Sequence, residues 1–174
     1  FKGWGTLTGY GYLIDLQELP AQSTATYGAR FAGKRDLGEG YGAQYALEYA
    51  QQSDYATNPG HYDLDYWLVE AGVSKSGFTL LGGLENLQGD GTRGFSTPLA
   101  TLHKFQGYAD VFLTTPANGI SDRYATFSYE TKVEELGPVT GVMAAVTYHD
   151  FQAERTSTSY GSEVDVELVA RMGD

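Results

Sequence analysis

The stretch Tyr41-Gly-Ala-Gln-Tyr-Ala-Leu-Glu-Tyr-Ala-Gln51 alternates between two kinds of side chain. The odd-numbered positions from 41 to 49 are Tyr, Ala or Leu, whereas the even-numbered positions from 42 to 50 are Gly, Gln, Ala or Glu. A helix would scatter these two sets around its circumference, but a strand points successive side chains to opposite faces. The period of two therefore predicts a β-strand with one apolar face and one polar face.

The same alternation recurs outward from this stretch and predicts eight strands, although the two faces of the strands at 62–74 and 78–88 are less distinct than the others. They span residues 2–16, 23–36, 41–51, 62–74, 78–88, 123–134, 139–149 and 162–172. The connections after the second, fourth and sixth strands are short, and the others are long. Successive antiparallel hairpins turn at opposite ends of a sheet, so the short turns gather at one end. Short turns at one end and long loops at the other are typical of outer-membrane β-barrels.

A soluble up-and-down barrel, such as a lipocalin, is the alternative to a membrane barrel. Its interior is filled by large apolar side chains, but here one predicted face is Gly, Ala, Thr and isolated charges. Gly and Ala cannot fill a dry core at native packing density. We therefore expect an all-β, antiparallel, up-and-down transmembrane β-barrel whose Tyr, Val, Leu and Phe face outer-membrane lipid. In the first strand this reasoning points Tyr10 and Tyr12 outward and Gly9 and Gly11 inward.

The composition limits the other classes of protein. The 174 residues suit one domain, 1–174, and a net charge of −11 argues against a nucleic-acid partner, whose binding surface should be basic. Cys is absent, which excludes disulfides and thiolate metal sites. The longest apolar run, 142–146, is far shorter than the roughly 20 residues of a transmembrane helix.

Charged residues on the inward face are the candidate solute-binding groups. These residues are Arg30, Lys34, Glu48, Glu130, Lys132, Glu167 and Arg171. Further inward carboxylates at Glu163 and Asp165 make this face acidic. An acidic lumen repels polyanions, so we expect the channel to prefer cations or neutral sugars.

The connection 89–122 is the most unusual segment of the chain. After Thr97-Pro98, apolar residues at 99, 102, 105 and 108 follow helical spacing and predict a short helix. A loop of this length is more often functional than idle. It either narrows the lumen, with His103, Lys104 and Asp110 at the constriction, or packs on the barrel rim.

The sequence gives weaker support to two other kinds of site. His149 and Asp150 suggest an acid–base pair, but adjacent strand residues point to opposite faces, so an enzyme is disfavoured. His61, Asp63 and Asp65 could offer ligands to Ca²⁺, as could Asp90 in its Gly-Asp-Gly turn, yet Asp and Gly are also ordinary turn residues. The sequence thus predicts no catalytic residue, no metal and no cofactor.

Several segments resemble the alginate-export family of outer-membrane, porin-like barrels. They are Phe1-Lys-Gly-Trp-Gly-Thr-Leu-Thr-Gly-Tyr-Gly-Tyr12, Tyr45-Ala-Leu-Glu-Tyr-Ala-Gln-Gln-Ser-Asp-Tyr55, residues 93–108, residues 112–119 and Tyr148-His-Asp-Phe151. The resemblance implies passive passage of hydrophilic solutes or oligosaccharides across the outer membrane of a Gram-negative bacterium. Barrels of this family have many more than eight strands, which implies that this chain is the later part of a larger barrel.

The number of strands separates a channel from a competing function. Eight strands alone leave an interior filled by side chains, as in a non-conducting structural barrel that engages another polypeptide. Lipid cannot satisfy unpaired backbone groups. The strands at 2–16 and 162–172 must therefore pair with each other, with strands outside this chain, or with another chain; we expect partners outside the chain.

Overall fold

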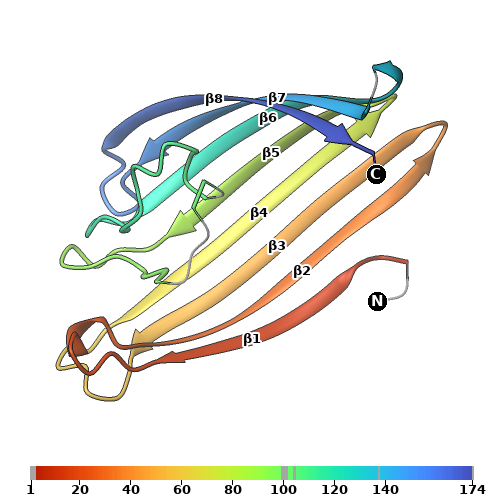
Figure 1. The fold of residues 1–174 in the computed structure, drawn as a ribbon. Helices are drawn as coiled ribbons and strands as arrows, with labels where there is room; N and C mark the ends of the chain where they lie inside the picture. Colours follow the sequence, from red (N-terminus) through yellow and green to blue (C-terminus); the bar gives the residue numbers. More distant parts are fainter. Residues whose placement is uncertain (1–2, 99–101, 104, 137, 174) are drawn as a thin grey trace.

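The computed structural model describes residues 3–98, 102–103, 105–136 and 138–173. They form one antiparallel sheet in which eight strands follow one another in chain order (Figure 1). The elements are β1 (Thr6–Ile14), the short 3-10 helix η1 (Pro20–Gln22), β2 (Thr24–Gly38), β3 (Tyr41–Asp54), β4 (Asp63–Lys75), β5 (Phe78–Leu87), β6 (Ile120–Leu136), β7 (Val139–Gln152) and β8 (Ser159–Met172). The predicted all-β, up-and-down architecture with eight strands is confirmed.

The sheet is curved but open. β1 and β8 lie at its two ends, and within the described residues neither pairs with the other (Figure 1). These eight strands therefore do not close into a barrel by themselves. Each end strand presents one row of backbone groups to which no strand of the described chain is bonded.

Cross-strand register sorts the side chains into two faces, because directly opposed residues of an antiparallel pair share a face. Arg30 lies opposite Glu48, and Leu68 links Glu48 to Glu85 through the next two ladders. We call the face that carries these residues the inner face. The outer face carries Leu47, Phe127 and Leu168, as the alternation predicted.

The outer face is apolar and exposed. Leu168 is 80% exposed, Phe127 54% and Leu47 50%. Other large apolar side chains of this face are also exposed: Tyr27, Tyr49, Val69, Val73, Leu80, Val146, Tyr148, Val164 and Val166. In water such a continuous apolar surface would be unusual, because soluble monomers rarely expose large apolar patches.

The side-chain faces predicted for the first strand were wrong. Tyr10 lies opposite Gly28 on the inner face, and its hydroxyl donates to Glu48 Oε1 at 2.7 Å. The ring covers Gly28, where a Cβ atom would collide with it. Gly9 and Gly11 instead lie on the outer face. The alternation itself is present, but its aromatic set lies on the inner face with Thr6 and Thr8, while Leu7 and Leu13 lie outward beside the glycines, so the rule that aromatic side chains face outward fails in this strand.

The long connection spans residues 88–119, slightly shorter than the predicted 89–122, and its described part contains turns and bends. The predicted helix is not formed there, because His103, Gln106 and Asp110 have φ values of 61°, 52° and 56°. An α-helix needs φ near −63°. Residues 99–101 and Lys104, also part of the expected helix, lie outside the described residues.

A small apolar core lies between the inner face and segment 88–119. Phe95 is 5% exposed and packs against the Tyr66 ring, with centroids 5.7 Å apart. Phe112 packs against Phe151 at 4.9 Å in the same way. The core also contains Ala50, Leu64, Leu68, Leu87 and Ile120. Segment 88–119 is thus held on the inner face rather than projecting from the edge of the sheet.

Truncating Phe95 should loosen this segment. We expect Phe95→Ala to lower the free energy of local opening by about 3–5 kcal/mol, the usual effect of removing a buried ring. Hydrogen exchange of segment amides measures the change. The matched control is Val111→Ala in the same segment, since Val111 is 68% exposed and its truncation should change stability by less than about 0.5 kcal/mol. Equal effects of the two substitutions would contradict the described packing.

Candidate functional site

Polar side chains are buried at the centre of the inner face, and they join the sheet to segment 88–119. Glu85 is 4% exposed. Its carboxylate accepts hydrogen bonds from the Tyr66 hydroxyl at 2.7 Å and from Gln106 Nε2 at 2.6 Å. Hydrogen bonds to a carboxylate are stronger than neutral ones, and they offset part of the cost of burying this group. Gln106 thereby anchors the segment above the middle strands.

Gln52 makes a second anchor. Its Oε1 accepts from the Ser96 backbone N–H at 2.7 Å, while Nε2 donates to the Ser96 carbonyl at 2.9 Å. The same Nε2 also donates to Thr26 Oγ1 at 2.9 Å. The side-chain amide therefore satisfies both backbone groups of one loop residue, as a neighbouring strand would.

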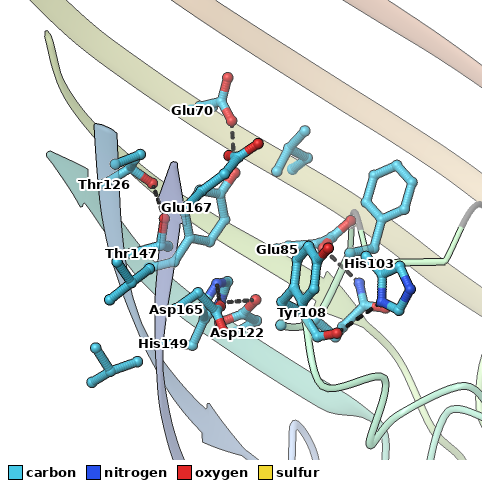
Figure 2. Close-up of a pocket in the computed structure, with 18 of the residues that line it drawn as sticks. Glu70, Glu85, His103, Tyr108, Asp122, Thr126, Thr147, His149, Asp165 and Glu167 are labelled. Atoms are coloured by element: carbon cyan, nitrogen blue, oxygen red, sulfur yellow. Dashed lines mark hydrogen bonds and ion pairs between the residues drawn. The ribbon is translucent and has the colours of Figure 1, made fainter. Parts of the chain in front are cut away.

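His149 and Asp122 form a buried pair across the β6–β7 ladder. His149 Nδ1 lies 2.8 Å from Asp122 Oδ2, and Nε2 lies 3.6 Å from Asp165 Oδ2 (Figure 2). The imidazole also stacks on Phe151, with centroids 5.4 Å apart. Asp150, the sequence neighbour, lies near Arg123 instead, at 3.9 Å. The sequence had identified the histidine but not its carboxylate partner.

All seven predicted inward charges occupy inner-face positions, where they fall into two groups. Arg30, Glu48 and Glu167 line a central cavity, and Arg30 Nη1 lies 2.5 Å from Glu48 Oε2. The second group, at the short-turn end, consists of Lys34, Glu130, Lys132 and Arg171. In that group Arg171 pairs with Glu130.

The central cavity has a volume of about 890 Å³ and lies under part of segment 88–119 (Figure 2). Its carboxylates come from five strands: Glu48, Glu70, Glu85, Asp122, Asp165 and Glu167. Sequence reasoning missed Glu70, Glu85 and Asp122. The faces of the strands at 62–74 and 78–88 were ambiguous, and the predicted start at residue 123 left Asp122 in the loop.

The three residues expected at the constriction, His103, Lys104 and Asp110, do not all line the central cavity. His103 lines the cavity and stacks on Tyr108, with centroids 4.5 Å apart (Figure 2). Asp110 is not part of the cavity wall: it accepts from the His103 backbone N–H at 2.8 Å and stabilises the turn. Lys104 lies outside the described residues. One of the three predicted residues thus faces the cavity, and a second positions it.

Three of the four residues considered for Ca²⁺, namely Asp90, His61 and Asp65, have other partners. Asp90 Oδ1 accepts hydrogen bonds from the backbone N–H groups of Arg93 and Thr92. Both hydrogen bonds lower the pKa of Asp90, and the one from Arg93 has the larger effect. His61 Nδ1 lies 3.3 Å from Asp54, and Asp65 accepts from the Tyr49 hydroxyl. Within the described residues, no group of three or more His, Cys, Asp or Glu side chains could hold a metal ion.

Neither protein-family models, nor curated proteins, nor solved structures give a match to this chain. In the described part of the chain, no helix has the length and apolar character needed to cross a membrane.

Removing the Gln52 anchor should release the start of the segment. Gln52→Ala leaves the Ser96 backbone groups without their partners, so we expect local opening to become easier by about 1–3 kcal/mol. Amide exchange at Ser96 and Phe95 measures the effect. Gln51→Ala is the matched control, because Gln51 is exposed on the outer face of the same strand. Unchanged exchange at Ser96 in Gln52→Ala would refute the anchor.

Proposed function

We propose that this chain forms part of an outer-membrane, porin-like β-barrel of a Gram-negative bacterium, through which hydrophilic solutes or oligosaccharides pass passively. The observation that carries the proposal is the distribution of polarity across the sheet. Exposed apolar side chains cover the outer face, whereas carboxylates, amides and a histidine are buried on the inner face. A soluble sheet protein has the opposite arrangement, but a barrel in lipid has this one.

The open edges support a larger barrel. In lipid, each unpaired backbone group of β1 or β8 would cost several kcal/mol, so both edges need partner strands. These strands belong to the same protein or to another chain. A barrel of eight strands is filled by its side chains, whereas one with 16–18 strands leaves an aqueous channel. Additional strands are therefore part of the proposal, as the alginate-export resemblance also implies.

Segment 88–119 is the proposed constriction. Its anchors at Glu85 and Gln52 hold it against the inner face, inside the space that a closed barrel would surround. The same observation favours one alternative: Phe95 and Phe112 fill part of this interior, as they would in a non-conducting barrel that engages another polypeptide. A conductance measurement distinguishes the channel from the non-conducting barrel.

The first test is ion flow through the complete protein in a planar bilayer. The acidic inner face predicts a cation-selective channel, and Glu167→Gln should reduce the ratio of cation to anion permeability because Glu167 lines the central cavity. The matched control is Glu39→Gln in the exposed turn between β2 and β3. Reversal potentials in a salt gradient measure selectivity. Anion preference would overturn the proposed selectivity, and an inserted protein without conductance would favour the non-conducting barrel.

A second test uses the two faces of one strand. Leu168→Arg places a charge on the proposed lipid face and should destabilise the inserted protein by about 2–4 kcal/mol near the bilayer midplane. Glu167→Arg, one residue away on the inner face, should cost much less. Reversible unfolding from lipid vesicles provides both free energies. Equal costs for the two arginines would mean that the outer face does not contact hydrocarbon.

A further inference from the structure

Aromatic rings and a cation form a row across the outer face, at the end of the sheet where the short turns lie (Figure 1). Its members are directly opposed in the β3–β4, β4–β5 and β5–β6 ladders: Tyr41, Lys75, Phe78 and Tyr129. The Phe78 and Tyr129 rings have centroids 4.4 Å apart, and Lys75 Nζ lies 3.7 Å from the centre of the Tyr41 ring. A cation is attracted to the face of an aromatic ring, so this contact holds the ammonium group on the outer surface.

Arg35 of β2 is a second cation at the same end of the outer face, where it lies opposite Ala43. Its Cζ lies 4.3 Å from the centre of the Trp4 ring, and its Nη1 donates to the Gly3 carbonyl at 2.6 Å. Trp4 is 61% exposed. Trp and Tyr favour the level of the lipid headgroups, because one part of the side chain is apolar and another part is polar. Both cations are thus positioned by residues typical of a membrane interface.

Among the described ion pairs, neither cation has a carboxylate partner. Asp36, the sequence neighbour of Arg35, belongs to the inner face, and its carboxylate accepts a hydrogen bond from the Gly38 backbone N–H. An anionic group could therefore approach Arg35 and Lys75 from the surrounding medium without displacing an ion pair that these residues already make.

The opposite end of the outer face, beside the long loops, has charges of the other sign. Asp63, Asp65 and Asp150 occupy outer-face positions there. Arg123 is a cation of this end, but it lies 3.9 Å from Asp150. An aromatic side chain is present here too, at Trp67 on the outer face of β4. The two ends of the outer face therefore differ in charge rather than in their possession of aromatic rings.

Apolar side chains continue from the cations toward the middle of the sheet. On β4 the outer-face residues that precede Lys75 include Val73 and Val69, and on β5 Leu80 follows Phe78. Val73 is 54% exposed and Leu80 55%. A ligand that fits this arrangement has an anionic group at one end and hydrocarbon at the other. A soluble anion would leave the apolar side chains uncovered, and burying them is favourable.

We propose that the short-turn end of the outer face binds anionic phospholipids, whose phosphate groups contact Arg35 and Lys75 and whose acyl chains cover the neighbouring apolar side chains. A guanidinium pairs with phosphate through two parallel hydrogen bonds, and an ammonium group binds it as a point charge. Each cation near an anionic bilayer surface should favour anionic over zwitterionic lipid by about fivefold. The inference names a lipid partner for the outer face and rests on the proposed membrane insertion.

Quenching of a single tryptophan by brominated lipid tests this inference in the complete protein, reconstituted in bilayers. One version retains Trp4 and another retains Trp67, with all other tryptophans replaced with Phe. The bilayers mix phosphatidylglycerol with phosphatidylcholine, and either lipid carries the bromine at the same fraction. We expect brominated phosphatidylglycerol to be enriched several-fold at Trp4, beside Arg35, and not at Trp67. Equal quenching of Trp4 by the two lipids would overturn the proposal.

Charge substitutions distinguish lipid binding from packing of the rings. Arg35→Gln should lower the preference at Trp4 by about fivefold, whereas Arg35→Lys keeps the charge and should retain most of it. Arg123→Gln is the matched control at the other end and should leave Trp4 unchanged. Tyr41→Trp, as the single tryptophan, gives the same comparison for Lys75→Gln. An unchanged preference in Arg35→Gln, or an equal loss in Arg123→Gln, would refute the assigned contacts.

The same preparations separate the lipid site from a site for soluble phosphate and from the barrel itself. If glycerol 3-phosphate abolishes the preference while sulfate at equal ionic strength does not, the cations bind soluble phosphate and the lipid proposal fails. Strong quenching of both tryptophans by both lipids, without a preference, retains contact of the outer face with hydrocarbon and excludes the lipid site. Absence of quenching by either lipid would contradict both the lipid site and the proposed membrane barrel.

Discussion

Side-chain alternation along paired strands is the constraint on which the rest of the structure depends. Because opposed residues in an antiparallel ladder share a face, seven ladders carry one assignment of faces from β1 to β8. A register shift of one residue in any ladder would exchange the faces beyond it. The outward orientation of Leu168 and the inward orientation of Glu167 therefore follow from the same register. Both orientations depend on every hairpin between β1 and β8.

The inner face shows how the sheet accommodates polar groups that the alternation forces inward. Glu85, Asp122 and Gln52 are buried, yet each has hydrogen-bond partners from another strand or from segment 88–119. Polar side chains of this inner face, such as Glu85 and Gln52, hold segment 88–119. A water-filled lumen would also be lined by polar side chains. The apolar residues of the segment cover the central strands. The inner face therefore contains a small apolar core beside the central cavity and its carboxylates.

The strands and the polarity of most faces could be predicted from the sequence, because both follow from a local period. The face of the first strand could not: Tyr10 turns inward, where Gly28, directly opposite in the next strand, leaves space for its ring. The predicted helix failed for a similar reason. Its spacing was compatible with a helix, but the described residues bend so that Gln106 can reach Glu85, a partner distant in sequence. Pairing between Asp122 and His149 likewise depends on register between strands.

The central claim is that the outer face meets hydrocarbon and the inner face meets water. Fluorescence of a single tryptophan at neighbouring positions on β8 tests this claim most directly. The complete protein, with its other tryptophans replaced with Phe, is reconstituted in lipid bilayers. Leu168→Trp should be quenched strongly by brominated acyl chains and weakly by acrylamide, and Glu167→Trp should show the reverse. Stronger acrylamide quenching at position 168 than at position 167 would contradict the account.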